Sequence, residues 1–119
     1  MPKVLISDSL SARAVEIFRG RGVETDVITG MKPEELIACI REYDGLAVRS
    51  ATKVTADVLE AAENLKVIGR AGIGVDNVDV RSATARGVVV MNTPFGNTIT
   101  TAEHAIAMMF ALEIGRAHV

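Results

Sequence analysis

The sequence has little of several features that would mark a particular class of protein. One cysteine, Cys39, excludes an internal disulfide and provides no cluster of zinc ligands, so we expect no metal site. Tryptophan is absent and aromatic residues make up only 3% of the chain, which removes the stacking platforms of single-strand nucleic-acid binders. A formal net charge of −2 gives no electrostatic reason to expect nucleic acid or a membrane as a partner. No apolar run is long enough to span a bilayer.

What the sequence does have is enough apolar material for one compact domain. It has 119 residues, of which 49% are hydrophobic, and a chain of this length can bury a real core. The first three residues lead directly into an apolar run and lack the form of a signal peptide. We therefore expect a cytoplasmic protein.

Short apolar runs alternate with stretches of helical periodicity along the chain. Glycine and proline support these element boundaries, since Gly22 and Gly87 follow two helical stretches and Pro33 lies at the start of another. The expected strands are residues 3–7, 24–28, 45–49, 66–68 and 88–92. The expected helices are residues 10–21, 32–43, 55–64, 77–86 and 100–112.

The expected strands are apolar throughout, which is typical of strands buried on both faces. This predicts an α/β fold with a parallel sheet covered by helices. Five strands favour the flavodoxin-like order 2-1-3-4-5 over a six-stranded dinucleotide-binding order.

Ligands of such sheets bind at the carboxyl ends of the strands. A candidate site should therefore be built from the residues that follow each apolar run. These are Ser7-Asp8, Arg49-Ser50, the stretch 70–74 and Asn92-Thr93-Pro94.

The glycine turn at 70–74 allows two interpretations. Gly72 and Gly74 supply the first two glycines of G-x-G-x-x-G, but Asn77 occupies the third place and the turn follows the fourth strand rather than the first. A dinucleotide pyrophosphate is thus the weaker hypothesis. A smaller anion fits better, because backbone amides next to glycines can hold a carboxylate.

Arg49 and Arg70 end two neighbouring strands of the predicted sheet. Guanidinium groups form charge-assisted hydrogen bonds with carboxylates and phosphates, so two of them in one crevice suggest a substrate with two anionic groups. The alternative is that both arginines are solvated strand-end residues and the glycines only make a tight turn.

Four stretches together resemble the D-2-hydroxyacid dehydrogenase family. They are V-L-I-S-D-S-L at 4–10, G-L-A-V-R-S-A-T-K-V-T at 45–55, V-I-G-R-A-G-I-G-V-D-N-V-D at 67–79 and M-N-T-P-F-G-N-T-I-T-T-A-E at 91–103. The resemblance covers residues 3–112, and the residues in these stretches favour the branch of the family that acts on 3-phosphoglycerate.

The resemblance implies an NAD-dependent oxidoreductase that oxidises 3-phospho-D-glycerate to 3-phosphooxypyruvate in L-serine biosynthesis, working as a homo-oligomer. It implies that Gly72, Ile73 and Gly74 form the substrate-carboxylate cradle, and that Ile73 also lies against the nicotinamide end of the cofactor. It further implies that Arg49, Ser50, Arg70 and Asn97 line the substrate and phosphate side.

The resemblance also implies that this sequence is a fragment. Residues 3–97 would be an incomplete substrate-binding domain, and residues 98–112 a helix leading into an NAD-binding domain further along. The family's catalytic arginine, glutamate and histidine would lie downstream, so no catalytic residue is expected here. His104 is expected to have a packing or surface role. Residues 113–119 depart from the family pattern, resemble a translated sequencing adapter and are expected to be non-native.

Other possibilities stay open or are excluded on particular residues. Another member of the family, such as a glyoxylate or hydroxypyruvate reductase, would share the carboxylate cradle. A stand-alone, non-catalytic carboxylate-binding module is a third possibility. A two-component receiver domain is excluded, because the third strand ends in Arg49 rather than a phosphorylatable aspartate. Asp76 and Asp79 are interpreted as charges at a helix N-terminus, and Cys39 as a core residue.

Overall fold

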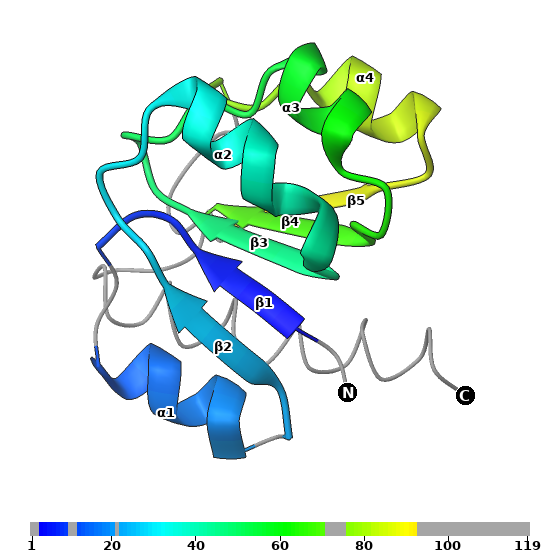
Figure 1. The fold of residues 1–119 in the computed structure, drawn as a ribbon. Coiled ribbons are helices and arrows are strands. Elements are labelled where there is room, and N and C mark those ends of the chain that lie inside the picture. The colour runs from blue at the N-terminus through cyan, green and yellow to red at the C-terminus, as the bar shows by residue number, and fades with distance from the viewer. Residues whose placement is uncertain (1–2, 10–11, 21, 71–75, 93–119) are drawn as a thin grey trace.

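Five parallel strands form one sheet in the order β2-β1-β3-β4-β5, as the sequence predicts. The computed structural model describes residues 3–9, 12–20, 22–70 and 76–92. Figure 1 shows the strands side by side with their arrowheads at the same edge of the sheet. The strands are β1 (Lys3–Ile6), β2 (Glu24–Val27), β3 (Gly45–Val48), β4 (Val67–Arg70) and β5 (Val89–Asn92).

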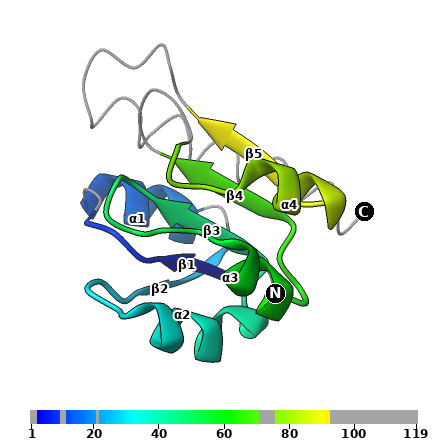
Figure 2. The same ribbon diagram turned by 90° about the horizontal axis from the view of Figure 1, so that it is seen from above.

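Helices cover both faces of the sheet. One face carries α1 (Ala12–Gly20), and the other carries three helices side by side (Figures 1 and 2). These three are α2 (Pro33–Cys39), which a 3-10 turn extends to Glu42, α3 (Ala56–Ala61) and α4 (Val80–Ala85). The structure is therefore the three-layered α/β arrangement that the apolar strands predict.

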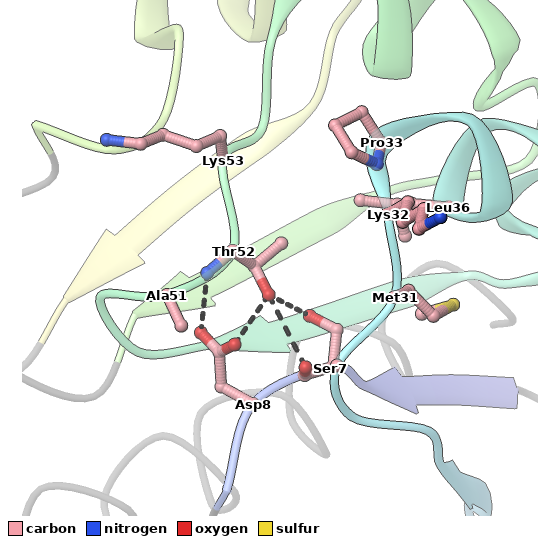
Figure 3. Close-up of a pocket in the computed structure, with 10 residues that line it drawn as sticks. Ser7, Asp8, Met31, Lys32, Pro33, Leu36, Ala51, Thr52 and Lys53 are labelled. Atoms are coloured by element: carbon pink, nitrogen blue, oxygen red, sulfur yellow. Dashed lines mark hydrogen bonds between the residues drawn. The ribbon is translucent and has the colours of Figure 1, made fainter.

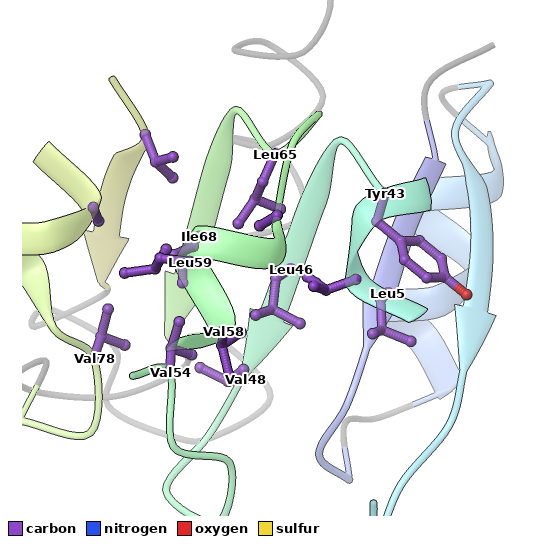
Figure 4. Close-up of a cluster of buried hydrophobic side chains, with 14 of the residues drawn as sticks. Leu5, Tyr43, Leu46, Val48, Val54, Val58, Leu59, Leu65, Ile68 and Val78 are labelled. Carbon is purple, nitrogen blue, oxygen red and sulfur yellow. The ribbon is translucent and has the colours of Figure 1, made fainter. Parts of the chain in front are cut away.

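The core consists of two clusters, one on each face of the sheet. Leu5, Leu46 and Ile68 are opposite one another in the β1–β3–β4 register and are fully buried under α2, α3 and α4 (Figure 4). The alternate residues Val4 and Val67 are fully buried on the α1 side, in the cluster that contains Phe18. Because successive side chains point to opposite faces and both faces are covered, the central strands β1, β3 and β4 are buried on both sides.

The sequence predicted the N-terminus of one helix correctly and that of another incorrectly. Thr55 caps α3 as expected, with its hydroxyl accepting the Val58 N–H at 3.4 Å. The helix predicted from residue 77 instead begins at Val80, and Asp79 is its cap. The prediction of a helical Asn77 was wrong because Val78 pairs with Val54 in a short parallel bridge that keeps the backbone extended before Asp79.

Gly87 ends α4 with a φ of +76°, a left-handed conformation that favours glycine. The Gly87→Ala variant is expected to lose about 1 kcal/mol of unfolding free energy, because a Cβ is strained at this φ. Urea denaturation would measure the loss. Gly20→Ala is the matched control, since Gly20 has no positive φ and an added methyl group would meet nothing within 4 Å. An equal effect at both glycines would contradict the explanation.

Asp79 predicts a pH dependence of stability. The backbone N–H of Ser82, and then the Ser82 hydroxyl, donate to the Asp79 carboxylate and hold its pKa below the ordinary value of 3.8. A carboxyl whose pKa is lowered by folding stabilises the fold fully above its unfolded pKa, and this contribution disappears as pH falls through the folded pKa. The stability difference between the native chain and Asp79→Asn should therefore shrink below about pH 4. Urea midpoints at neutral and acidic pH would show this; a difference independent of pH would contradict it.

Several expectations lie outside the described residues. They are the helix at 100–112, the packing role of His104, and the assignments of residues 98–112 and 113–119. Within the described part of the chain, no helix has the length and apolar character needed to cross a bilayer.

Candidate functional site

The structure brings the two predicted arginine positions to the same edge of the sheet. β4 extends two residues beyond its expected end, because Arg70 pairs in register with Val48. Arg49 follows Val48 directly, so the two arginines leave neighbouring strands one position apart. Their guanidinium groups have different partners, and the expected convergence on one crevice is not seen among the described contacts.

Arg70 is not a solvated strand-end residue. Its side chain is only 14% exposed, and its Nη1 donates to Asp76 Oδ1 at 2.7 Å. Asp76 is 89% exposed, and a hydrogen bond from its own backbone, followed by the Arg70 guanidinium, lowers the pKa of its carboxyl. Asp76 therefore pairs with Arg70, and the interpretation of this residue as a helix N-terminal charge was wrong, since α4 begins four residues later.

Arg49 is half-buried and lies beyond the carboxyl ends of β1 and β3. Its Nη1 donates to the carbonyl oxygen of Ser9 at 3.1 Å, which ties the side chain to the segment after β1. Ser50, the next residue, is exposed. In the described part of the site, the Arg49 guanidinium is thus held near the surface, and the Arg70 guanidinium lies deeper, beside Asp76.

The loop that starts at Arg49 is held by Asp8, which follows β1. Its Oδ2 accepts the Arg49 N–H at 2.7 Å. Figure 3 shows its contacts with Thr52, in which Oδ2 accepts the N–H at 3.1 Å and Oδ1 accepts the hydroxyl at 2.6 Å. The Thr52 hydroxyl has one proton, which it uses in the hydrogen bond to the Asp8 carboxylate. The Ser7 hydroxyl must therefore be the donor in the 2.9 Å hydrogen bond between Ser7 Oγ and Thr52 Oγ1. Asp8 and Ser7 are only 6% and 3% exposed.

Asn77 holds the same loop from the opposite side. Its Nδ2 donates to the carbonyl oxygens of Arg49 and Thr52, both at 2.7 Å. Asn77 is 8% exposed, and its Oδ1 has no hydrogen-bond partner among the described residues. Its carbonyl accepts the Val54 N–H, and two residues further on the Asp79 N–H donates to the Val54 carbonyl, so the backbone on either side of Val78 is held as well.

The strand-end pattern pointed to Asp8 but gave it no role, and it did not point to Thr52 or Asn77. Asp8 stood alone at the end of a strand, and Asn77 was assigned to a helix. The only available clue was the place of Asp8 directly after an apolar strand, because nothing in one segment shows its partner in another.

A small cleft lies beside this loop, between it and the start of α2. Its volume is about 130 Å³, and Asp8 and Thr52 form part of its wall together with Lys32 and Leu36 (Figure 3). No group of three or more potential metal ligands occurs within the part of the chain that the structure describes.

Four of the predicted site residues lie outside the described residues. They are Gly72, Ile73, Gly74 and Asn97. The carboxylate cradle and the contact with nicotinamide that were expected of them remain predictions.

The family of the chain follows from its sequence and agrees with its fold. Residues 4–117 match the model of the D-isomer specific 2-hydroxyacid dehydrogenase catalytic domain. The chain belongs to this family.

The chain is also similar to individual relatives and solved structures within this family. The chain is 56% identical over 109 residues to D-3-phosphoglycerate dehydrogenase of Archaeoglobus fulgidus, covering 92% of this chain and 21% of that protein. The NAD+-bound 3-phosphoglycerate dehydrogenase of Entamoeba histolytica matches with a TM-score of 0.71 and 34% identity, covering 78% of this chain and 33% of that one. The glyoxylate/hydroxypyruvate reductase of Sinorhizobium meliloti matches with a TM-score of 0.66 and 32% identity, covering 79% and 29%. The chain spans about a fifth of the length of the curated relatives it matches.

Proposed function

We propose that the chain is the substrate-binding part of an NAD-dependent D-3-phosphoglycerate dehydrogenase. In this reaction the C2 hydride of 3-phospho-D-glycerate passes to NAD+ and the hydroxyl proton passes to a base, which leaves 3-phosphooxypyruvate. The product would enter L-serine biosynthesis. The whole protein would act as a homo-oligomer in the cytoplasm.

Arg49 is the observation that carries this proposal. It is a guanidinium at the carboxyl edge of a parallel sheet, where such folds bind ligands. Two side-chain hydrogen bonds hold its backbone, and two more hold the backbone of Thr52 in the same loop. A guanidinium fork is suited to a phosphate as well as to a carboxylate. Relatives more than half identical to the chain are named for a substrate that carries a phosphate and a carboxylate.

Each site residue has its own part in the proposed binding. Arg49, Ser50, Arg70 and Asn97 would bind the phosphate side of the substrate. Gly72, Ile73 and Gly74 would hold its carboxylate with their backbone amides, and Ile73 would also contact the nicotinamide ring. NAD would otherwise be bound by a domain outside these 119 residues, which would also supply the base.

The purified chain is therefore expected to bind the substrate without turning it over. Titration with 3-phospho-D-glycerate, followed by NMR of the arginine side chains, should shift the Arg49 and Arg70 signals to saturation. Mixing the chain with substrate and NAD+ should produce no NADH above the blank. NADH formation would contradict the assignment of catalysis to another domain, and an absence of binding would contradict the substrate assignment.

The source DNA gives a second test. A long read across the codon for Leu112 is expected to continue into a strand, a G-x-G-x-x-G turn and later a glutamate and a histidine. The resulting full-length protein should oxidise 3-phospho-D-glycerate with NAD+. A stop codon directly after Val119 would instead leave a non-catalytic carboxylate-binding module.

A second member of the family is the main alternative. The structural similarity to a glyoxylate/hydroxypyruvate reductase is of comparable quality, and the carboxylate cradle would serve both substrates. The two functions differ in whether the site needs a second anion subsite, and variants of Arg49 decide between them.

A further inference from the structure

We propose that Asp8 and Asn77 act as a pair of positioning residues that fix the direction of Arg49 for substrate binding. This inference rests on the proposed function, because it assigns a role to two side chains that bind no substrate themselves. The sequence placed Asp8 at a strand end of the candidate site without a role and assigned Asn77 to a helix.

The two side chains hold the same two residues from opposite sides. Oδ2 of Asp8 accepts the N–H groups of Arg49 and Thr52, and Nδ2 of Asn77 donates to the carbonyl groups of the same two residues. Asp8 follows β1, and Asn77 lies between β4 and α4, so the partners come from two separate parts of the fold. All four main-chain polar groups of Arg49 and Thr52 thereby have a side-chain partner.

This arrangement restrains Arg49 in particular. The N–H on one side of its Cα and the carbonyl on the other are both fixed, so φ and ψ of Arg49 are held together and with them the direction of its Cα–Cβ bond. A long side chain magnifies any error in that direction at its guanidinium end. A catalytic or binding group needs its geometry fixed in advance by its support if it is to bind strongly.

The chemistry of the contacts also sets the orientation of the Asn77 amide. Two carbonyl oxygens can only accept hydrogen bonds, so the NH2 group must face them and Oδ1 must point away. Asn77→Asp keeps the shape of the side chain but places a carboxylate against two carbonyl oxygens. This substitution should therefore break both bonds with almost no change in volume.

This pair of contacts, the Asp8–Asn77 clamp, also connects the two halves of the proposed site. Asn77 follows the glycine stretch 72–74 along the sequence, and its amide bonds directly to the residue proposed to bind the phosphate. Asp8 and Asn77 are both buried, so water competes little for their hydrogen bonds and the clamp stays closed.

Asn77→Asp is the main test, with Asn64→Asp as the matched control. Asn64 is an exposed amide that donates to the Arg41 carbonyl at 2.7 Å and lies before β4, at the opposite edge of the sheet. In titrations of the chain, Asn77→Asp is expected to weaken 3-phospho-D-glycerate about tenfold or more, whereas Asn64→Asp should not change the affinity beyond about twofold. Carbonyl-carbon NMR shifts of Arg49 and Thr52 should report the loss of the bonds independently of the substrate.

Asp8 provides a second pair of variants in case Asn77→Asp does not fold. Asp8→Ala removes every acceptor and should speed hydrogen exchange of the Arg49 and Thr52 amides while weakening substrate binding. Asp8→Asn retains one oxygen for the two N–H groups, and its NH2 group can donate to the Thr52 hydroxyl. Asp8→Asn should therefore bind the substrate with most of the native affinity, unlike Asp8→Ala. If binding required the negative charge of Asp8, both variants would lose affinity alike.

The outcomes separate this inference from the function on which it rests. If the native chain binds and Asn77→Asp loses the two carbonyl bonds yet binds equally well, the positioning role is overturned and the proposed function stands. The same holds if Asp8→Ala binds normally with exchange-labile Arg49 and Thr52 amides. If the native chain does not bind 3-phospho-D-glycerate, the proposed function fails and this inference fails with it.

Discussion

Leu46→Ala is expected to lower the free energy of unfolding by about 3–5 kcal/mol. Leu46 is fully buried in β3, the central strand of the sheet, and packs under α2 and α3 in the larger core cluster. The substitution removes buried methyl groups and leaves a cavity that neighbouring strands cannot close. Because a domain of this size is stable by only about 5–15 kcal/mol, urea denaturation followed by circular dichroism should show a large fall in the midpoint.

A matched pair of valines separates burial from strand position. Val67 and Val89 begin adjacent strands and face each other in the register, but Val67 is fully buried and Val89 is 40% exposed. Val67→Ala should cost about 2 kcal/mol and Val89→Ala less than about 1 kcal/mol. Equal losses would show that the strand rather than the core accounts for the effect, and would contradict the reason given for Leu46.

Arg49→Ala should weaken the binding of 3-phospho-D-glycerate about ten- to a hundredfold. The reason is the loss of the charge-assisted hydrogen bonds that a guanidinium makes with a phosphate. D-glycerate, which has the carboxylate but no phosphate, should lose much less affinity. Isothermal titration of both ligands would give the two ratios.

Two further variants complete this comparison. Arg49→Lys keeps the charge but not the planar fork, and should recover only part of the affinity. Arg41→Ala is the control, since Arg41 is an exposed arginine whose contact is with Glu63 at 3.6 Å, away from the proposed site. An equal loss of affinity for both ligands in Arg49→Ala would overturn the phosphate assignment and favour a reductase of unphosphorylated 2-hydroxyacids.

The sequence predicts the architecture because burial on both faces leaves a direct trace in the strands. The run G-L-A-V at 45–48 contains no alternation, its four residues are buried in β3, and helices lie on both faces of the sheet (Figure 2). The boundaries were harder to predict, since they depend on contacts with other segments. β4 reaches Arg70 through its pairing with Val48, and α4 starts late because of the bridge between Val54 and Val78.

The site was predictable only in part for the same reason. Strand-end geometry places Arg49 and Arg70 correctly from the order of elements alone. The supporting contacts are distant in sequence: Asp8 and Thr52 are 44 residues apart, and Asn77 and Arg49 are 28 apart. A pattern within one segment shows that Asn77 is polar, but not that a loop two elements away needs its amide.

The strand order has a consequence for how the protein is made. A ribosome releases the chain from its N-terminus, and the first two strands can form only a two-stranded ribbon, which is marginal in water. The second neighbour of β1 is β3, which ends at Val48. Asp8 is in place from the start but has no loop to hold until Thr52 has been synthesised, and Arg49 meets its second clamp residue only when Asn77 follows. The contacts that hold Arg49 are therefore complete only after Asn77 has been synthesised, and the sheet only after β5 has followed. A nascent chain released before these residues should be a substrate for proteases.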